Sequence, residues 1–200
     1  MSWMWPDAAM RLQGGGLRLE PLTLDHIAGL EEASATASDW EWENGFVPRP
    51  GDIPAYVNRA VWEFRKGQSF PFAVCLESGK AIGASWYRVF DSWRKKVEIG
   101  FTRYHKSHRR TFVNAQAKLL LMSCAFETLG CILVEFLVHE KNAPSRAAMA
   151  ALGAHQDGFL RRVVPMKDGT FADVVVFSVS DSEWRSVKGA LLTRLTGVTR

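Results

Sequence analysis

Apolar and polar residues repeat with two different periods in the first part of the chain. Residues 17–22 alternate at every second position, which predicts a strand. Residues 23–34 and 52–66 repeat at helical spacing and predict two amphipathic helices. The intervening residues 35–51 are rich in Trp, Asp, Glu, Pro and Gly, which is typical of a long loop.

The pattern then changes to strands and more deeply buried helices. Two strand patterns flank Ser78-Gly79-Lys80 and predict a β-hairpin. An almost unbroken apolar run at 131–138 predicts a strand covered on both faces. The remaining expected elements are strands at 95–101, 159–166 and 171–180 and helices at 114–129, 142–152 and 181–195. This order predicts a single α/β domain with a mixed central sheet of about six to seven strands, flanked by helices on both faces.

Composition sets the broad class of the protein. Its 200 residues, 47% hydrophobic and 23% charged, suit one globular domain with a sizeable core. We expect residues 1–15 to be a flexible leader and residues 16–200 to form the domain. No apolar run approaches the ~20 residues that cross a bilayer, so no membrane partner is expected. Three cysteines in apolar surroundings suggest reduced thiols and a cytoplasmic location.

Charge is distributed unevenly along the chain. Residues 88–118 contain nine Lys and Arg against two acids, a net +7, so the rest of the chain carries −3 of the overall +4. Residues 31–52 are acidic, with six Asp and Glu against one Arg. Such a division suits an anionic ligand at one place and a cationic one at another, although two solvated faces would look the same.

The basic segment has a definite local context. A strand pattern ends at Ile99-Gly100-Phe101, a cationic loop follows, and a helix begins near Val113-Asn114. Helix N-termini bind anions through unpaired N–H groups and the positive end of the helix dipole. The segment therefore predicts an anion site, with a solvated basic turn as the plain structural alternative.

Two other interpretations of the cations find less support. The sequence pI of about 9.1 raises nucleic-acid binding, but the cations are local and no basic stripe interleaved with aromatic residues is present, so no nucleic-acid partner is expected. His105 and His108 lie among cations without a third ligand, so no metal is expected.

Four short motifs in order resemble the GNAT superfamily of acyl-CoA N-acetyltransferases, in particular its ribosomal-protein alanine N-acetyltransferase branch. They are Glu98-Ile99-Gly100, the segment Arg109 to Asn114, Asn142-Ala143-Pro144-Ser145 and Leu152-Gly153-Ala154. The resemblance covers roughly residues 16–196. It implies acetyl-CoA as co-substrate.

The resemblance also implies which residues contact acetyl-CoA. They are Phe101, Thr102, Arg103, Arg109, Arg110, Thr111, Phe112, Val113, Asn114, Asn142 and Ser145. Lys106 or Arg103 would meet the 3′-phosphate. The chain departs from the family signature, because Phe112 replaces its glycine and Asn114 its second small residue. Glycine permits close backbone approach to phosphate, so a catalytically weak or inactive acyl-CoA-binding regulator is the alternative to an enzyme.

For the chemistry, the resemblance implies that the strand ending at Phe101 splays from its neighbour and offers backbone N–H groups to the acetyl carbonyl. Glu98 is the expected general base, and its alternative is a structural pair with Lys95, Lys96 or an Arg. Many superfamily members carry a tyrosine as the acid where this chain has Met149. Ser145 is then the expected donor to the sulfur, or else only a first-turn helix residue.

The acceptor is expected over the first two helices and their loop. Trp40, Trp42 and Glu43 are the expected substrate-binding residues, because aromatic and acidic side chains suit a cation with apolar stems. This favours a primary amine: a peptide N-terminus, a polyamine or an aminoglycoside-like molecule. A Trp-rich loop that only covers the sheet edge is the alternative. A homodimer is possible.

Overall fold

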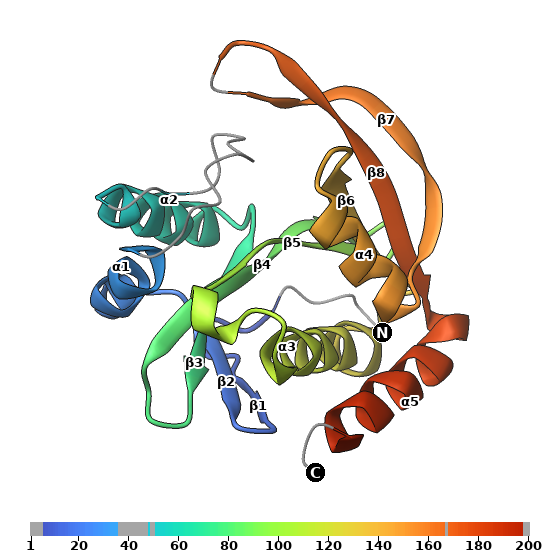
Figure 1. Ribbon diagram of the computed structural model, residues 1–200, viewed down its shortest axis with the longest axis horizontal. Helices are drawn as coiled ribbons and strands as arrows, with labels where there is room; N and C mark the ends of the chain where they lie inside the picture. Colours follow the sequence, from blue (N-terminus) through green and yellow to red (C-terminus); the bar gives the residue numbers. More distant parts are fainter. Residues whose placement is uncertain (1–5, 36–47, 49–50, 167, 198–200) are drawn as a thin grey trace.

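A computed structural model describes residues 6–35, 48, 51–166 and 168–197. Within these residues one sheet of eight strands runs in the order β1-β2-β3-β4-β5-β6-β8-β7 (Figure 1). Its strands are β1 (Leu12–Gly14), β2 (Leu17–Pro21), β3 (Phe70–Leu76), β4 (Ala81–Asp91), β5 (Lys96–Tyr104), β6 (Leu133–His139), β7 (His155–Pro165) and β8 (Phe171–Ser180). Neighbouring strands are antiparallel except β5 and β6, which are parallel, so the sheet is mixed as expected.

The helices agree closely with the helical patterns. They are α1 (Ile27–Ala35), α2 (Ile53–Arg65), α3 (Phe112–Ser123), α4 (Ala143–Leu152) and α5 (Asp181–Gly197). A 3-10 turn η1 (Leu24–His26) precedes α1, another, η3 (Lys106–His108), precedes α3, and a π-helical turn η4 (Cys124–Thr128) extends α3. Gly130 and Gly153 follow η4 and α4 with φ of +68° and +83°, so both helix ends stop where glycine adopts the left-handed conformation.

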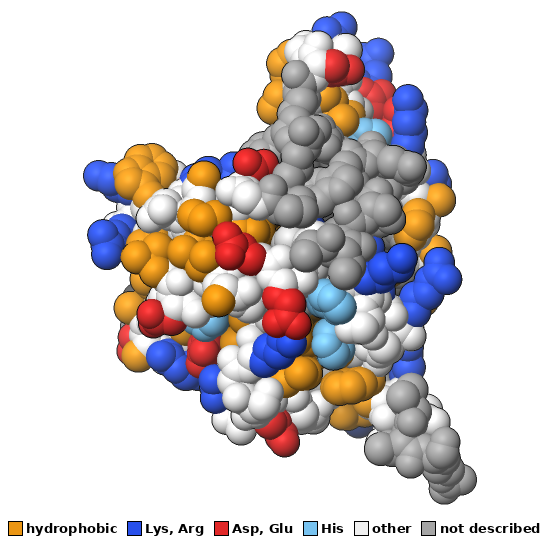
Figure 2. All heavy atoms as spheres, turned by 60° about the vertical axis from the view of Figure 1, so that its left-hand side comes forward, with side chains coloured by type: hydrophobic (Ala, Val, Ile, Leu, Met, Phe, Trp, Pro, Cys, Tyr) orange, Lys and Arg blue, Asp and Glu red, His pale blue; other side chains and the backbone are white. Residues whose placement is uncertain are grey.

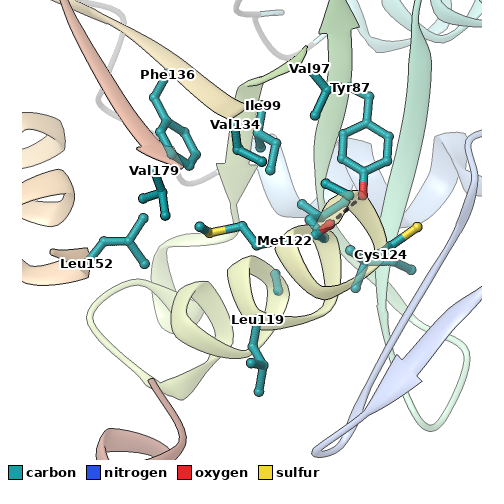
Figure 3. Packing of buried hydrophobic residues seen from close by; sticks show 14 of the residues in the cluster. Tyr87, Val97, Ile99, Leu119, Met122, Cys124, Val134, Phe136, Leu152 and Val179 are labelled. Carbon is teal, nitrogen blue, oxygen red and sulfur yellow. Dashed lines mark hydrogen bonds between the residues drawn. The ribbon is translucent and has the colours of Figure 1, made fainter. Parts of the chain in front are cut away.

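Helices cover both faces of the sheet (Figure 1). The smaller core cluster joins α1 and α2 to β3 and β4, through residues such as Leu30, Val57 and Trp86. The larger cluster joins α3, α4 and α5 to the opposite face. Figure 3 shows Ile99 and Val97 of β5 and Val134 and Phe136 of β6 on the α3 side. The strand β5 thus has a different helical layer on each side.

Two features differ from the sequence expectations. Strand β6 is not fully buried on both faces: Val134, Phe136 and Val138 are buried, and the residues between them are only half-buried. The reason is that the core cluster under α1 and α2 packs mainly on β3 and β4 and includes no residue of β6. The second difference is at the N-terminus, where a flexible leader was expected up to residue 15. Strand β1 pairs there with β2, and Gly15 and Gly16, at φ of +55° and +80°, make the tight turn between them.

No helix among the described residues is long and apolar enough to span a membrane.

Candidate active site

The centre of the candidate site is a local break in the sheet at β5. The register between β5 and β6 ends with Glu98 opposite Glu135, although both strands continue beyond these residues. On the other side of β5, the pairing with β4 shifts between Ala84 and Trp86, so that Phe101 and Thr102 together face one residue. This is a β-bulge, and Phe101 has a φ of +49°. Strands β5 and β6 therefore part just before the bulge in β5.

Phe101 and Thr102, the two residues of the bulge, have their side chains on opposite faces of β5. Phe101 packs against the cluster under α1 and α2, with its ring centroid 5.1 Å from that of Trp86. Thr102 turns to the α3 face, where its Oγ1 lies 2.7 Å from the Ser85 hydroxyl. Because β5 and β6 are parallel, their C-terminal ends lie at the same end of the strands. The segments that lead into α3 and α4 both begin there.

The N-terminus of α3 follows the basic loop and is capped by its own side chain. Thr111 Oγ1 accepts a hydrogen bond from the Val113 N–H at 3.3 Å and donates one to the His108 carbonyl at 2.7 Å. Arg110, just before the cap, has a φ of +58°, which is uncommon for a residue with a side chain. Helix geometry gives the first N–H groups of α3 no intrahelical acceptor. The loop and helix start thus have the character of an anion site.

Arg103 at the end of β5 and the two arginines of the loop lie in different surroundings. Arg109 is half-buried and donates from Nε to the Tyr104 carbonyl at 3.1 Å, and its burial lowers the pKa of its guanidinium. Arg110 is exposed. Arg103 instead donates from its guanidinium to the Pro48 carbonyl at 2.6 Å and lies against the α1 and α2 layer. Its side chain is therefore engaged away from the α3 N-terminus.

Phe112 is the first residue of α3, and its side chain turns to the protein interior. It packs against the larger core cluster and lies beside the Gly15-Gly16 turn. The aromatic ring therefore belongs to the packing between α3 and the N-terminal hairpin. The Phe112 side chain, which stands where the family has a glycine, is thus accommodated on the side of α3 that faces the N-terminal hairpin.

Glu98 is held in a buried ion pair on the face of β5 opposite Thr102. It is 5% exposed, and Arg88 Nη1 lies 2.6 Å from its Oε1. Arg88 also lies over the Phe101 ring, 4.0 Å from its centroid. Burial raises the pKa of the Glu98 carboxyl, and the Arg88 charge and hydrogen bond oppose that rise. The expected pairing with an arginine is thus present, and a raised pKa makes the carboxylate a stronger proton acceptor than an ordinary one.

The sequence interpretation missed Lys118. This lysine of α3 is 4% exposed, and its Nζ lies 3.3 Å from Thr102 Oγ1 and 4.8 Å from the Phe136 ring centroid. Burial lowers the pKa of its ammonium group to about 7. The sequence signal is a single lysine within an otherwise apolar helical pattern, but its burial depends on strands distant in the chain.

The start of α4 is organised by Asn142. Its Oδ1 accepts a hydrogen bond from the Ser145 N–H at 3.0 Å, so the predicted N-cap is confirmed. Ser145 is half-buried. Met149, one turn further, is buried in the core, where it can offer no acidic proton.

The expected acceptor residues Trp40, Trp42 and Glu43 lie outside the described residues. An apolar pocket lies on this side of the sheet, between α1, α2 and the bulge region, and is lined by Leu30, Ile53, Tyr56 and Arg103 among others. Figure 2, which brings the α1 and α2 side forward, shows histidine side chains grouped beside an acidic and a basic side chain.

One group of potential metal ligands is present in the described part of the chain, formed by Glu20, His26 and Cys75. The Thr23 N–H donates to His26 Nδ1 at 3.0 Å, which leaves the ring proton on Nε2 to bond Glu20 at 3.0 Å. Arg18 also pairs with Glu20 at 2.8 Å, and burial raises the pKa of the Cys75 thiol to about 11. The group is therefore satisfied by its own hydrogen bonds, and its thiol stays protonated.

Parted parallel strands, a bulge in β5 and a basic segment before α3 make up the candidate site. The model of the acetyltransferase (GNAT) domain family matches residues 16–155, and the chain belongs to this family. It is an acyltransferase of the GNAT type. A search of curated proteins gives no match.

Solved structures agree over nearly the whole chain. A protein from T. thermophilus, assigned as an acetyltransferase, is 30% identical, with a TM-score of 0.83 over 96% of this chain and 100% of its own. A GCN5-related N-acetyltransferase from Brucella melitensis is 29% identical, with a TM-score of 0.83 over 96% of this chain and 87% of its own. The fold is shared as well with Mycobacterium smegmatis RimJ in complex with CoA-disulfide, which is 21% identical, with a TM-score of 0.75 over 95% of both chains.

Proposed function

We propose that this protein transfers the acetyl group of acetyl-CoA to a primary amine. The observation that carries the proposal is the parting of β5 and β6 beside the α3 N-terminus. A pantetheine arm needs a slot with free peptide groups, and a pyrophosphate needs N–H donors and cations. The break in the sheet and the basic helix start fit these two needs.

The α3 segment would hold the phosphates. Backbone N–H groups of residues 111–114 and the guanidiniums of Arg109 and Arg110 suit the pyrophosphate, because forked, charge-assisted hydrogen bonds favour phosphate oxygens. Lys106 is exposed and remains the candidate for the 3′-phosphate, since the Arg103 guanidinium is engaged with Pro48. The inward packing of Phe112 supports this role for its N–H.

The chemistry would take place at the bulge. Backbone N–H groups of Phe101 and Thr102 are the candidates to polarise the acetyl carbonyl, a contribution on the order of 3 kcal/mol per donor in known oxyanion holes. Glu98 would accept the proton of the attacking amine, directly or through water. Asn142 and Ser145 begin α4 at the same end of the strands, where they would bind the pantetheine arm and the sulfur.

The acceptor remains defined by chemistry only. A primary amine fits the acidic and aromatic composition of residues 39–46 and the acid Glu98 on the α1 and α2 side of β5. A peptide N-terminus, a polyamine and an aminoglycoside-like molecule all carry this group. A cytoplasmic location is proposed on the three buried cysteines, which form no disulfide, and a homodimer stays a prediction.

Calorimetric titration with acetyl-CoA, followed by thiol-release assays on an amine panel, tests the proposal. We expect saturable binding and turnover on at least one amine class. Absence of saturable binding contradicts the proposal. Tight binding without turnover on any amine favours the inactive acyl-CoA-binding regulator instead.

A further inference from the structure

Lys118 is a buried lysine whose hydrogen-bonding capacity is only partly used within the described part of the protein. An ammonium group has three N–H donors. Among the described residues, the one hydrogen-bond acceptor of Lys118 Nζ is Thr102 Oγ1 at 3.3 Å. Buried polar groups are normally satisfied, and a lysine is rarely this deeply buried without a paired acid. The side chain therefore has donors left for a ligand.

The position of the ammonium group is set by three elements. Its Nζ contacts Thr102 on β5 and lies over the Phe136 ring on β6. The register between β5 and β6 ends where Glu98 is opposite Glu135. Thr102 is four residues beyond Glu98 on β5, and Phe136 directly follows Glu135 on β6. Lys118 thus reaches from α3 to the place where the two strands part.

The candidate phosphate site lies at the N-terminus of the same helix. Lys118 is seven residues after the N-cap Thr111, which is about 10 Å along the helix axis. An acyl-CoA whose pyrophosphate is bound at the N-terminus can therefore extend its arm along α3 toward the Lys118 amine.

The other candidates for proton donation are weak. Met149 is buried and apolar, and the hydroxyl of Ser145 is a poor acid. Among the described residues, the recorded contacts of Lys118 Nζ are the neutral Thr102 hydroxyl on β5 and the Phe136 ring on β6, and the Thr102 hydroxyl in turn lies 2.7 Å from that of Ser85 on β4. Burial alone lowers the pKa of Lys118 to about 7, so charged and neutral forms are close in free energy at neutral pH. A proton at this site is easily given and regained.

We propose that Lys118 is a catalytic residue that donates a hydrogen bond and then a proton to the CoA sulfur as the acetyl group leaves; the inference rests on the proposed function. The amine nitrogen forms the amide bond to the acetyl carbon, the carbon–sulfur bond breaks, and the electron pair of the broken bond stays on sulfur. One proton of the Lys118 ammonium passes to that sulfur and gives the CoA thiol. Glu98 releases the proton of the acceptor amine to solvent, and the neutral Lys118 amine regains a proton from solvent.

The decisive measurement is the pKa of the CoA thiol in the binary complex, followed by thiolate absorbance as the pH is raised. The thiol and Lys118 titrate as a coupled pair, and we expect the thiol to ionise first, with its pKa lowered by about 2 units or more relative to free CoA, while the Lys118 ammonium beside it keeps its proton to higher pH. In Lys118→Met the lowering disappears while CoA still binds. Gln116→Met is the matched control: Gln116 is a buried polar residue of the same helix that instead faces the Gly15 turn. This control keeps the lowered thiol pKa.

Turnover gives a second readout. Lys118→Met lowers kcat roughly 10²-fold with little change in KM for acetyl-CoA, and it removes the fall in kcat at high pH that deprotonation of Lys118 causes in the native protein. If Lys118→Met does not fold, the native protein labelled with 13C-lysine decides. The Lys118 Cε signal then reports a higher ammonium pKa with CoA than without it.

The outcomes separate the two proposals. No saturable CoA binding to the native protein removes both. CoA binding with a thiol pKa equal to that of free CoA, or equal in the native protein and Lys118→Met, overturns the role of Lys118 and leaves the acetyltransferase proposal standing. An unchanged Lys118 pKa on CoA addition overturns it as well.

Discussion

The cations before α3 and the charges at the parted strands share one small region but differ in their surroundings. Lys106 and Arg110 are exposed, and Arg109 is half-buried. Lys118 and Glu98 are 4% and 5% exposed, on opposite faces of β5. Exposed charges attract anions over a distance and are screened by salt. Buried charges act only on what touches them, and burial moves their pKa values toward neutrality, lowering that of Lys118 and raising that of Glu98.

We therefore expect the two groups of charged residues to have different roles in the site. Changes in the loop should alter affinity for acetyl-CoA and its salt dependence. Changes at the parted strands should alter turnover and its pH dependence. Each variant below tests this division.

The largest effect is expected from Glu98→Gln. Loss of a general base lowers turnover by about 10²- to 10⁴-fold, and the affinity for acetyl-CoA should change little because Glu98 is on the other face of β5 from the α3 helix. Steady-state kinetics and calorimetry measure the two quantities. In the native protein the rising limb of kcat/KM should lie above the usual carboxylate range, because the pKa of Glu98 is raised.

Glu135→Gln is the control for this variant. Glu135 is opposite Glu98 in the sheet and pairs with Lys96 at 2.6 Å. It should keep near-native turnover. Unchanged turnover in Glu98→Gln would remove Glu98 as the base and leave its pair with Arg88 as a structural one.

The next largest effect is expected from Arg109→Ala. Loss of a charge-assisted hydrogen bond costs about 1.5–3 kcal/mol, which is roughly a tenfold to hundredfold loss of acetyl-CoA affinity. The salt dependence of binding should also become weaker, while turnover at saturation is retained. Arg94→Ala, which removes an exposed arginine paired with Asp91, is the control and should leave affinity unchanged. A loss of turnover without a loss of affinity would contradict the division.

Lys118→Met also makes a prediction about stability. The unfolded chain keeps the lysine proton up to its ordinary pKa of 10.5, whereas the folded protein keeps it only up to about 7. Between these values the unfolded state binds more protons, so the contribution of Lys118 to stability rises with pH and is lowest below pH 7. Lys118→Met should therefore be more stable than the native protein at low pH. The excess in its free energy of unfolding over that of the native protein should shrink by at most roughly 1.4 kcal/mol per pH unit above pH 7.

Urea unfolding of both proteins at several pH values measures this advantage. An advantage that does not depend on pH would show that Lys118 is protonated in the folded protein throughout, and hence that burial does not shift its pKa.

The smallest effect is expected from Arg110→Gly. Glycine adopts the left-handed conformation of this position freely, so the variant should gain about 1 kcal/mol of stability and lose a modest part of its acetyl-CoA affinity with the missing charge. Arg162→Gly in β7 is the matched control, since Arg162 has a φ of +55° far along the chain from the loop. It should gain similar stability with unchanged affinity. An affinity loss in both variants would point to a general effect of the substitution.

Periodicity predicted most of the elements because each strand or helix has one dominant buried face. The hairpin of β3 and β4 and the caps at Asn142, Gly130 and Gly153 follow from local residue chemistry, and so they could be predicted directly. Strand β1 was missed because three glycines indicate flexibility in isolation and a tight turn only beside a pairing strand.

The site was predictable only in part, because its chemistry depends on contacts between distant segments. The Arg88–Glu98 pair joins two strands, and no local pattern selects Arg88 over the other nearby cations. The inward turn of Phe112 depends on the N-terminal hairpin. Burial of Lys118 depends on β5 and β6, 16 and 18 residues away in the chain. The roles of all these residues remain proposals.

Amide hydrogen exchange with and without acetyl-CoA tests the central claim most directly, because it reports where the ligand binds. The account predicts protection at residues 101–102 and 111–114, where the bulge and the start of α3 present their N–H groups, and none at the distant β7–β8 hairpin. Absence of protection at both segments, under conditions in which acetyl-CoA saturates the protein, would contradict it.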